Sequence, residues 1–220
     1  MRAIGVDVGS RALHAVALDD GCVDARVFAI AELRELAAWC AGAVGVGIDA
    51  PDGPSAGAHA CDAQVAPKFR AGRCGEVALG RQRGYWVSWV TPAEPAPGSW
   101  MDAGIRTHVA LREVGIETIE VFPYAGFRVL AGGARLPRKT TAAGLRERAA
   151  LLRASGVRDG DLARWSHDLL DGALAAVVAL QRAEGRAERI GCPEDAGCGQ
   201  DGSAIWLPVA ERVLRAATRP

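Results

Sequence analysis

The stretch 166–180, SHDLLDGALAAVVAL, predicts a helix with apolar residues on nearly every side. A helix of that kind is normally buried in the core of a protein. Asp168 and Asp171 nevertheless lie three residues apart in it, and His167 stands beside them. A buried carboxylate is costly unless it is paired, hydrogen-bonded or bound to a metal. The helix therefore predicts that another part of the chain supplies a partner for these two acids.

Strand-like runs precede this helix and alternate with helical patterns. Three apolar or β-prone runs are joined by short turns, which predicts an antiparallel meander over 2–8, 12–18 and 22–30. A helical pattern over 31–41 then leads to the apolar run 44–49. Because a helix separates that run from the meander, we expect it to lie parallel to an earlier strand. A fifth strand is predicted at 116–122.

The rest of the chain is expected to surround this sheet. Residues 51–98 are irregular, with PDGPSAG and TPAEPAPG at their ends, and they predict an insertion or lid that is partly helical around 60–80. A further helix is predicted to end at Gly156, and 202–217 to form a short strand and a terminal helix. We expect one domain over 1–220, an α/β fold with a mixed five-stranded sheet flanked by helices.

Acidic residues fall at the ends of the strands that are predicted to be parallel. Asp7 ends the first strand, Asp49 ends the fourth, and Glu120 lies near the end of the fifth. Ligands of open α/β sheets bind at the carboxyl ends of strands. Asp168 and Asp171, on one face of a helix, would complete a group of five carboxylates there. Such a group would repel itself without a divalent cation, and oxygen ligands suit Mg²⁺ or Mn²⁺.

Each acid also has an ordinary structural explanation. Asp168 could complement the dipole of its helix, and His167 could be an exposed first-turn residue. Asp7 and Asp49 could end their strands at turns. Glu120 could pair with an arginine. One metal site accounts for all five acids together, whereas these explanations need a separate cause for each.

Composition narrows the class of protein. Half of the residues are hydrophobic, enough for a core, and no apolar run has the length of a membrane span. Without a signal segment at the start, we expect a soluble, cytoplasmic protein with reduced cysteines. The charges of the 26 basic and 26 acidic residues cancel, so the net charge is zero. A neutral chain argues against a protein that coats nucleic acid nonspecifically. Cys192 and Cys198 share a Gly-rich loop, but their spacing fits no common zinc pattern.

Several short motifs, in a fixed order, resemble a known family. They are GVDVGS, IDAP, RCGEVALG, IEVFPYAGFRVL, LPRK, GLRERAALL, HDLLDGALAA and IWLP. Together, from residue 2 to about 208, they resemble the family catalogued as domain of unknown function 429, a predicted nuclease class. The first motif, GIDAP and the D-x-x-D pair are also similar to RuvC-type Holliday-junction resolvases. The resemblance implies a ribonuclease H-like fold and metal-dependent nuclease activity.

The resemblance also implies a set of site residues. The metal ligands and catalytic acids carried over are Asp7, Asp49, Glu120, Asp168 and Asp171. Arg73 and Glu76 match further motifs that have no assigned role, and we expect them to contact substrate. Gly172 departs from the pattern, because alanine often follows the aspartate in nucleases of this sort. Glycine there costs some helix propensity but leaves the carboxylates alone.

The leading functional hypothesis is hydrolysis of phosphodiester bonds in nucleic acid. Two Mg²⁺ or Mn²⁺ ions, about 4 Å apart, would activate a water and stabilise the leaving oxygen. Asp7 would bridge them, with Asp49 and Asp171 on one ion each. His167 or Lys139 could orient water or a phosphate oxygen. DNA and RNA, and internal and terminal cleavage, remain open.

Aromatic residues beside arginines offer a second contact with nucleic acid. The stretch RQRGYWVSW places Trp86 and Trp89 where they could stack on unpaired bases. Packing within a hydrophobic lid or a core strand is the alternative, and the apolar content of the stretch favours it.

Two other functions remain open. A nucleotide-binding kinase or ATPase of the actin and sugar-kinase type begins with a similar Asp-x-Gly loop, here DVGS. Such proteins normally need two domains of this kind and a second glycine-rich loop, which this sequence does not show. A noncatalytic module that binds nucleic acid on the same fold is the other alternative.

Overall fold

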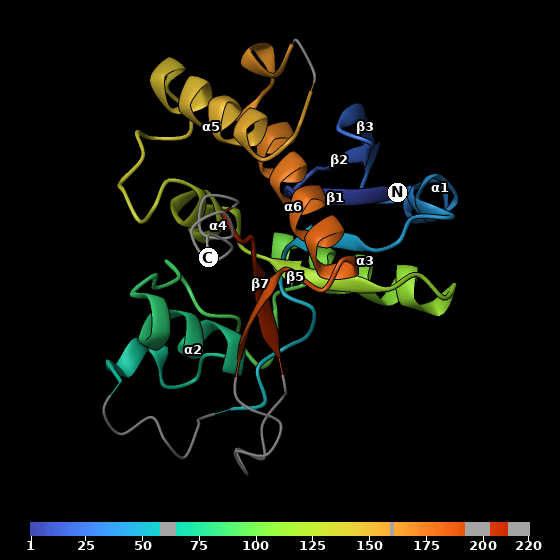
Figure 1. Cartoon of the computed structure of the whole chain (residues 1–220). Coiled ribbons are helices and arrows are strands. Elements are labelled where there is room, and N and C mark those ends of the chain that lie inside the picture. Colours follow the sequence, from blue (N-terminus) through green and yellow to red (C-terminus); the bar gives the residue numbers. More distant parts are fainter. Residues whose placement is uncertain (58–64, 159–160, 192–202, 211–220) are drawn as a thin grey trace.

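A single seven-stranded sheet runs through the protein (Figure 1). The computed structural model describes residues 1–57, 65–158, 161–191 and 203–210. In these residues the strand order is β3-β2-β1-β4-β5-β7-β6. The strands are β1 Arg2–Val8, β2 Ala12–Asp19, β3 Cys22–Ala29, β4 Val46–Asp49, β5 Thr118–Val121, β6 Glu188–Gly191 and β7 Ala204–Leu207.

The strand directions agree with the predicted fold. The first three strands form an antiparallel meander, and β4, β5 and β7 lie parallel to β1. Asp20 and Gly21 have φ angles of 46° and 84°, the backbone that a tight β2–β3 turn requires. The predicted α/β class, with three antiparallel strands followed by parallel ones, is therefore confirmed.

The predicted number of strands is wrong, because the described sheet has seven rather than five. The short strand expected within 202–217 is β7, and it joins the sheet beside β5. β6 pairs antiparallel with β7 and was not predicted. Its four residues, ERIG, contain no apolar run, so pairing rather than composition determines this strand. Cys192 and Cys198, and the terminal helix beyond residue 210, lie outside the described residues.

Helices cover both faces of the sheet (Figure 1). They are α1 Leu33–Cys40, α2 Cys74–Arg83, α3 Trp100–Glu113, α4 Pro123–Leu130, α5 Ala142–Ala154 and α6 His167–Ala183. α1 and α3 share a core with one face of β1, whereas α4, α5 and α6 form a core on the other face. Ser99, Thr141 and Ser166 each accept a backbone N–H through the side chain, which explains where three of the helices begin.

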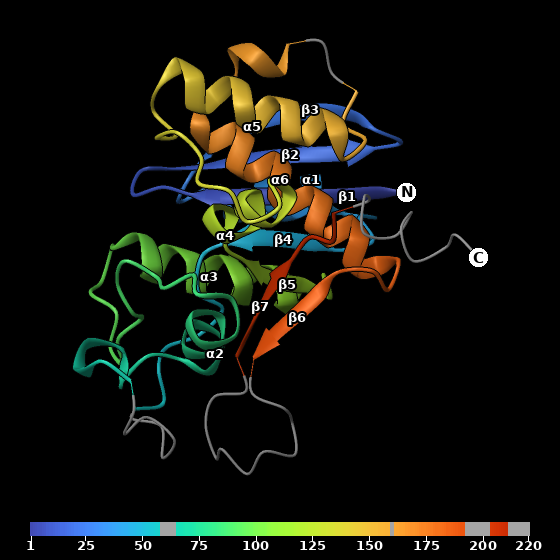
Figure 2. The ribbon, with the colours of Figure 1, turned by 60° about the vertical axis from the view of Figure 1, so that its left-hand side comes forward.

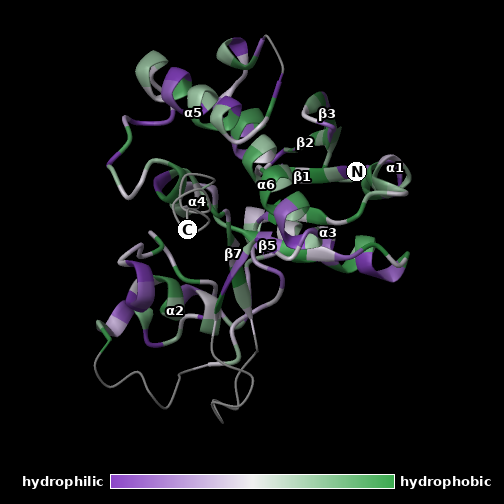
Figure 3. Ribbon diagram, in the orientation of Figure 1, coloured by the Kyte–Doolittle hydropathy of each residue, from purple (hydrophilic) through white to green (hydrophobic). Residues whose placement is uncertain are grey.

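The buried helix α6 lies directly on the sheet because glycines remove the side chains between them. A Cβ atom on Gly5 would stand 1.9 Å from the carbonyl oxygen of Gly172, and one on Gly47 2.4 Å from that of Ala175. A Cβ on Gly172 would stand 2.9 Å from the carbonyl oxygen of His14. This close approach explains the glycine that departs from the family pattern. Figure 3 shows hydrophobic residues along β1 and much of α6.

The segment between β4 and α3 corresponds to the predicted insertion, and its described parts are 51–57 and 65–98. It contains the short 3-10 helix η2 Pro67–Phe69 and α2. α2 packs against β6 and β7, as Figure 2 shows at the lower edge of the sheet. Within the described part of the chain, no helix is long and apolar enough to cross a membrane.

Candidate metal centre

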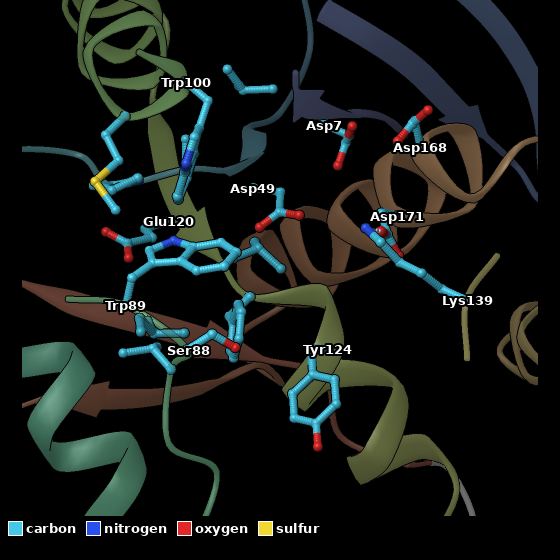
Figure 4. Close-up of a pocket in the computed structure, with 18 of the residues that line it drawn as sticks. Asp7, Asp49, Ser88, Trp89, Trp100, Glu120, Tyr124, Lys139, Asp168 and Asp171 are labelled. Atoms are coloured by element: carbon cyan, nitrogen blue, oxygen red, sulfur yellow. Dashed lines mark hydrogen bonds and ion pairs between the residues drawn. The ribbon is translucent and has the colours of Figure 1, made fainter. Parts of the chain in front are cut away.

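Three aspartates meet where α6 crosses the ends of β1 and β4. Asp7 and Asp49 are register partners on these neighbouring parallel strands, so their side chains leave the same face of the sheet. Asp171 reaches them from the helix above. One carboxylate oxygen from each of the three residues lies within 4.8 Å of the other two, as Figure 4 illustrates. The close contact of α6 with the sheet is what brings the third acid into range.

This trio carries more negative charge than its surroundings neutralise. Burial, with Asp7 and Asp171 nearby, raises the pKa of Asp49 well above its usual value. Burial also raises the pKa of Asp171 to about 6, although Lys139 acts in the opposite direction. The Lys139 ammonium donates to Asp171 Oδ2 at 2.6 Å. Arg148 also favours the charged form of Asp171. Buried carboxylates whose pKa values stay raised despite these two cations form a site that a divalent cation would stabilise.

A second group shares Asp7 and includes a histidine that the sequence analysis missed. Ligand atoms of Asp7, His14 and Asp168 also lie within 4.8 Å of one another. His14 Nδ1 is 3.7 Å from Asp7 Oδ2, an ion-pair distance rather than a hydrogen bond. Asp7 raises the pKa of His14, although burial opposes this effect. His14 is the register partner of Asp7 across the β1–β2 hairpin, and a short turn over 9–11 could have indicated that pairing.

His167 lies apart from the trio. Its Nδ1 stands 2.7 Å from Asp168 Oδ1, and both side chains are about one-third exposed. The residues that line the adjoining cleft include Asp168 and Lys139 but not His167. The structure therefore places Lys139 against the trio, through Asp171, and His167 against Asp168 only.

Glu120 pairs with Arg73 and does not join the other acids around a common metal site. It pairs in register with Ile48, so it points toward the opposite face of the sheet from Asp49, one residue further along β4. Its two carboxylate oxygens accept hydrogen bonds from Arg73 at 2.5 and 2.7 Å. Burial raises the pKa of Glu120 to about 7, although Arg73 lowers it. Among the described residues, Glu120 belongs to neither group of potential metal ligands, so the five acids do not form one cluster.

Arg73 and Glu76 are buried members of this network, and Glu76 also lines the cleft beside the acids. Arg73 is only 1% exposed and also contacts Asp52 and Glu76. Glu76 accepts hydrogen bonds from the backbone N–H and the hydroxyl of Thr91. The network ties the start of α2 to β5 and to the loop after β4. Its residues are therefore placed to position the segment that borders the site.

A cleft of about 780 Å³ opens beside the acids. Its lining includes the trio, Trp86 and Trp89. The two tryptophans have different surroundings, although the sequence analysis predicted the same role for both. Trp86 stacks on Phe69 with ring centroids 4.4 Å apart, as packing within the segment predicts. Trp89 is 59% exposed and meets the edge of Trp100 at 5.8 Å.

Comparisons with known proteins find a family model and solved structures that are similar to this chain. The family described as "Protein of unknown function (DUF429)" matches residues 98–196. The predicted resemblance to this family is confirmed there. The matched segment holds Glu120, Lys139, Asp168 and Asp171, whereas Asp7 lies before it.

One of the similar solved structures is RuvC from Thermus thermophilus. The two chains share 14% sequence identity and superpose with a TM-score of 0.46, over 84% of this chain and 98% of that one. No curated protein matches the sequence.

Proposed function

We propose that this protein is a nuclease that uses divalent metal ions to hydrolyse phosphodiester bonds in nucleic acid. The observation that carries the proposal is the trio of Asp7, Asp49 and Asp171, whose ligand oxygens lie within 4.8 Å of one another. Burial raises the pKa of two of these acids, and Lys139 is their closest described cation. The all-oxygen donors and the surplus of negative charge fit Mg²⁺ or Mn²⁺.

The residues that would hold metal follow from the two groups of ligands. Asp7, Asp49 and Asp171 would hold one ion, and Asp7, Asp168 and His14 offer ligands for another. Asp7 belongs to both groups, which supports its proposed place between two ions. When bound, such ions lower the pKa of a water and neutralise charge on the leaving oxygen.

The neighbouring side chains would orient substrate and hold protons. Lys139 favours the charged form of Asp171, and its side chain is 44% exposed toward the cleft, so its ammonium can also meet a phosphate oxygen. Without metal, Asp7 raises the pKa of His14, so His14 would have to release its proton before a ring nitrogen could bind an ion. The Arg73 network holds the loop after β4, and with it the end of the strand that carries Asp49.

The test is cleavage of a panel of single-stranded, duplex and branched DNA and RNA. Wild-type protein should cleave at least one member with Mg²⁺ or Mn²⁺, and EDTA should stop the reaction. Asp7→Asn keeps the size of the side chain but removes the charge, so it should abolish cleavage while the protein stays folded. Asp24→Asn is the matched control, because Asp24 lies exposed on β3 and should tolerate the change.

Two results would overturn the proposal. Cleavage that persists in folded Asp7→Asn protein would show that the trio does not carry the chemistry. A wild-type protein that binds members of the panel but cleaves none of them would favour the noncatalytic binding module.

A further inference from the structure

One wall of the cleft is formed by aromatic side chains. Trp89, Trp100 and Tyr124 all line it, and Tyr124 is 50% exposed. In Figure 4 Asp49 lies between the Trp89–Trp100 pair and Lys139, and Asp171 lies beside Lys139. Trp86 is different, because it covers Gly80 and stacks on Phe69 and so has a packing role. Aromatic rings that stay exposed beside a polar site provide a surface on which a flat ligand can stack.

The opposite wall of the cleft includes Arg138 and Lys139, which belong to a strongly basic segment of the chain. Residues 128–158 contain eight basic residues and one acid, Glu147. The basic residues are Arg128, Arg135, Arg138, Lys139, Arg146, Arg148, Arg153 and Arg158. Arg138 lines the cleft and is exposed, and no ion-pair partner contacts its guanidinium among the described residues. Of these eight, Arg138, Lys139 and Arg148 line the cleft, and Arg148 is buried. Arg138 and Lys139 therefore give the cleft a positive edge beside the acids, suited to a phosphate backbone.

We propose that this cleft binds a single unpaired strand of nucleic acid, with a base stacked on Trp89 and the adjoining backbone along Arg138. The inference rests on the proposed function and specifies its substrate class. In a duplex, both faces of each base are already stacked, so only an unpaired base can lie on an exposed ring. The cleft, at about 780 Å³, has the size of pockets that enclose one small ligand. It suits a few nucleotides of one strand better than a double helix.

The positions of these residues define a path for the nucleic-acid strand across the site. A base on the aromatic wall and a phosphate near Arg138 or Lys139 leave the intervening backbone over Asp7, Asp49 and Asp171. Tyr124 provides a second exposed ring on the aromatic side, at the start of α4. The strand would then pass from the β4–α3 segment, over the acids, to the loop before α5.

Binding can be tested separately from cleavage by fluorescence anisotropy. The probes are a labelled oligothymidine, the same strand paired with its complement, and an abasic strand of equal length. Titrations contain Ca²⁺, which also takes oxygen ligands, and a gel checks that the strands stay intact. Wild-type protein should bind the unpaired strand more tightly than the duplex or the abasic strand.

Variants separate stacking from charge. Trp89→Leu should weaken binding of the unpaired strand by about fivefold to 150-fold, the loss expected for one base–aromatic stack. Trp89→Phe should keep most of the affinity, because it retains a ring. Arg138→Gln should reduce the slope of log Kd against log salt by about 0.7, the value for one phosphate contact on a single strand. Arg34→Gln is the matched control, since Arg34 is exposed on α1 and does not line the cleft.

The outcomes distinguish this inference from the nuclease proposal. Equal affinity for duplex and unpaired strands, or wild-type binding by folded Trp89→Leu protein, overturns the inference even if the protein cleaves nucleic acid. Strand-selective binding that Trp89→Leu weakens supports the inference even if no cleavage is found. In that second case the nuclease proposal alone fails.

Discussion

The replacement Arg73→Met tests whether the buried ion-pair network, rather than a metal, neutralises Glu120. Arg73 donates to both oxygens of Glu120 at 2.5 and 2.7 Å, and it is nearly inaccessible to solvent. Hydrogen bonds to charged groups contribute about 1.5–3 kcal/mol each, so these two account for about 3–6 kcal/mol. Removing one partner of a buried ion pair typically costs about 3–5 kcal/mol. We therefore expect the free energy of unfolding to fall by about 3–5 kcal/mol at pH 8.

The loss should depend on pH in a definite direction. Burial already raises the pKa of Glu120 to about 7, above its usual value, and the loss of the guanidinium would raise it further. A carboxyl with a raised pKa in the folded state stabilises the protein when protonated and loses that contribution as pH rises through the folded pKa. The difference between wild type and Arg73→Met should therefore be larger at pH 8 than at pH 5.

Urea denaturation followed by circular dichroism measures both effects. Arg106→Met is the matched control, because Arg106 forms an exposed pair with Asp102 and should cost at most about 1 kcal/mol. Adding Glu120→Gln to Arg73→Met should recover part of the stability at pH 8, since it removes the unpaired charge. A loss below about 1 kcal/mol for Arg73→Met, or no recovery in the double variant, would refute the reasoning.

Three further predictions concern the metal, the helix contact and the aromatic residues. In thermal melts, Mn²⁺ should raise Tm more at pH 8 than at pH 5. Burial raises the pKa of Asp171 to about 6, and metal binds the ionised carboxylate, which is more abundant at pH 8. Asp171→Asn should remove most of the Mn²⁺ shift. Gly5→Ala should destabilise the fold by at least about 1–3 kcal/mol in urea melts, since its Cβ would overlap α6, whereas Gly53→Ala, with open space around it, should change little. Trp86, which is 38% exposed but stacks on Phe69, should lower the free energy of unfolding by about 1–3 kcal/mol when changed to Ala. The more exposed Trp89→Ala should lower it by less than about 0.5 kcal/mol. An equal Mn²⁺ shift in the Asp171 variant, equal losses for both glycines, or equal losses for both tryptophans would contradict the respective prediction.

Local sequence patterns determined much of the architecture. The apolar runs at 2–8 and 12–18 and the turn signal before Cys22 predict the strands of the antiparallel meander, because short apolar runs bounded by turn residues are typical of strands. The apolar pattern after Ser166 predicts α6, and the strand ends predict where Asp7 and Asp49 lie. These features depend on neighbours in the chain, so they can be read without knowing the fold.

Tertiary structure alone decided which partner each polar group meets. Glu120 and Asp49 look equivalent in sequence, yet the β4–β5 register turns them to opposite faces, and Arg73, 47 residues away along the chain, takes Glu120. His14 joins Asp7 only through strand pairing, and β6 exists only because β7 lies beside it. These contacts join residues that are distant in the sequence. Their geometry depends on strand register and on the close approach of α6 to the sheet, and no local sequence pattern specifies either of these.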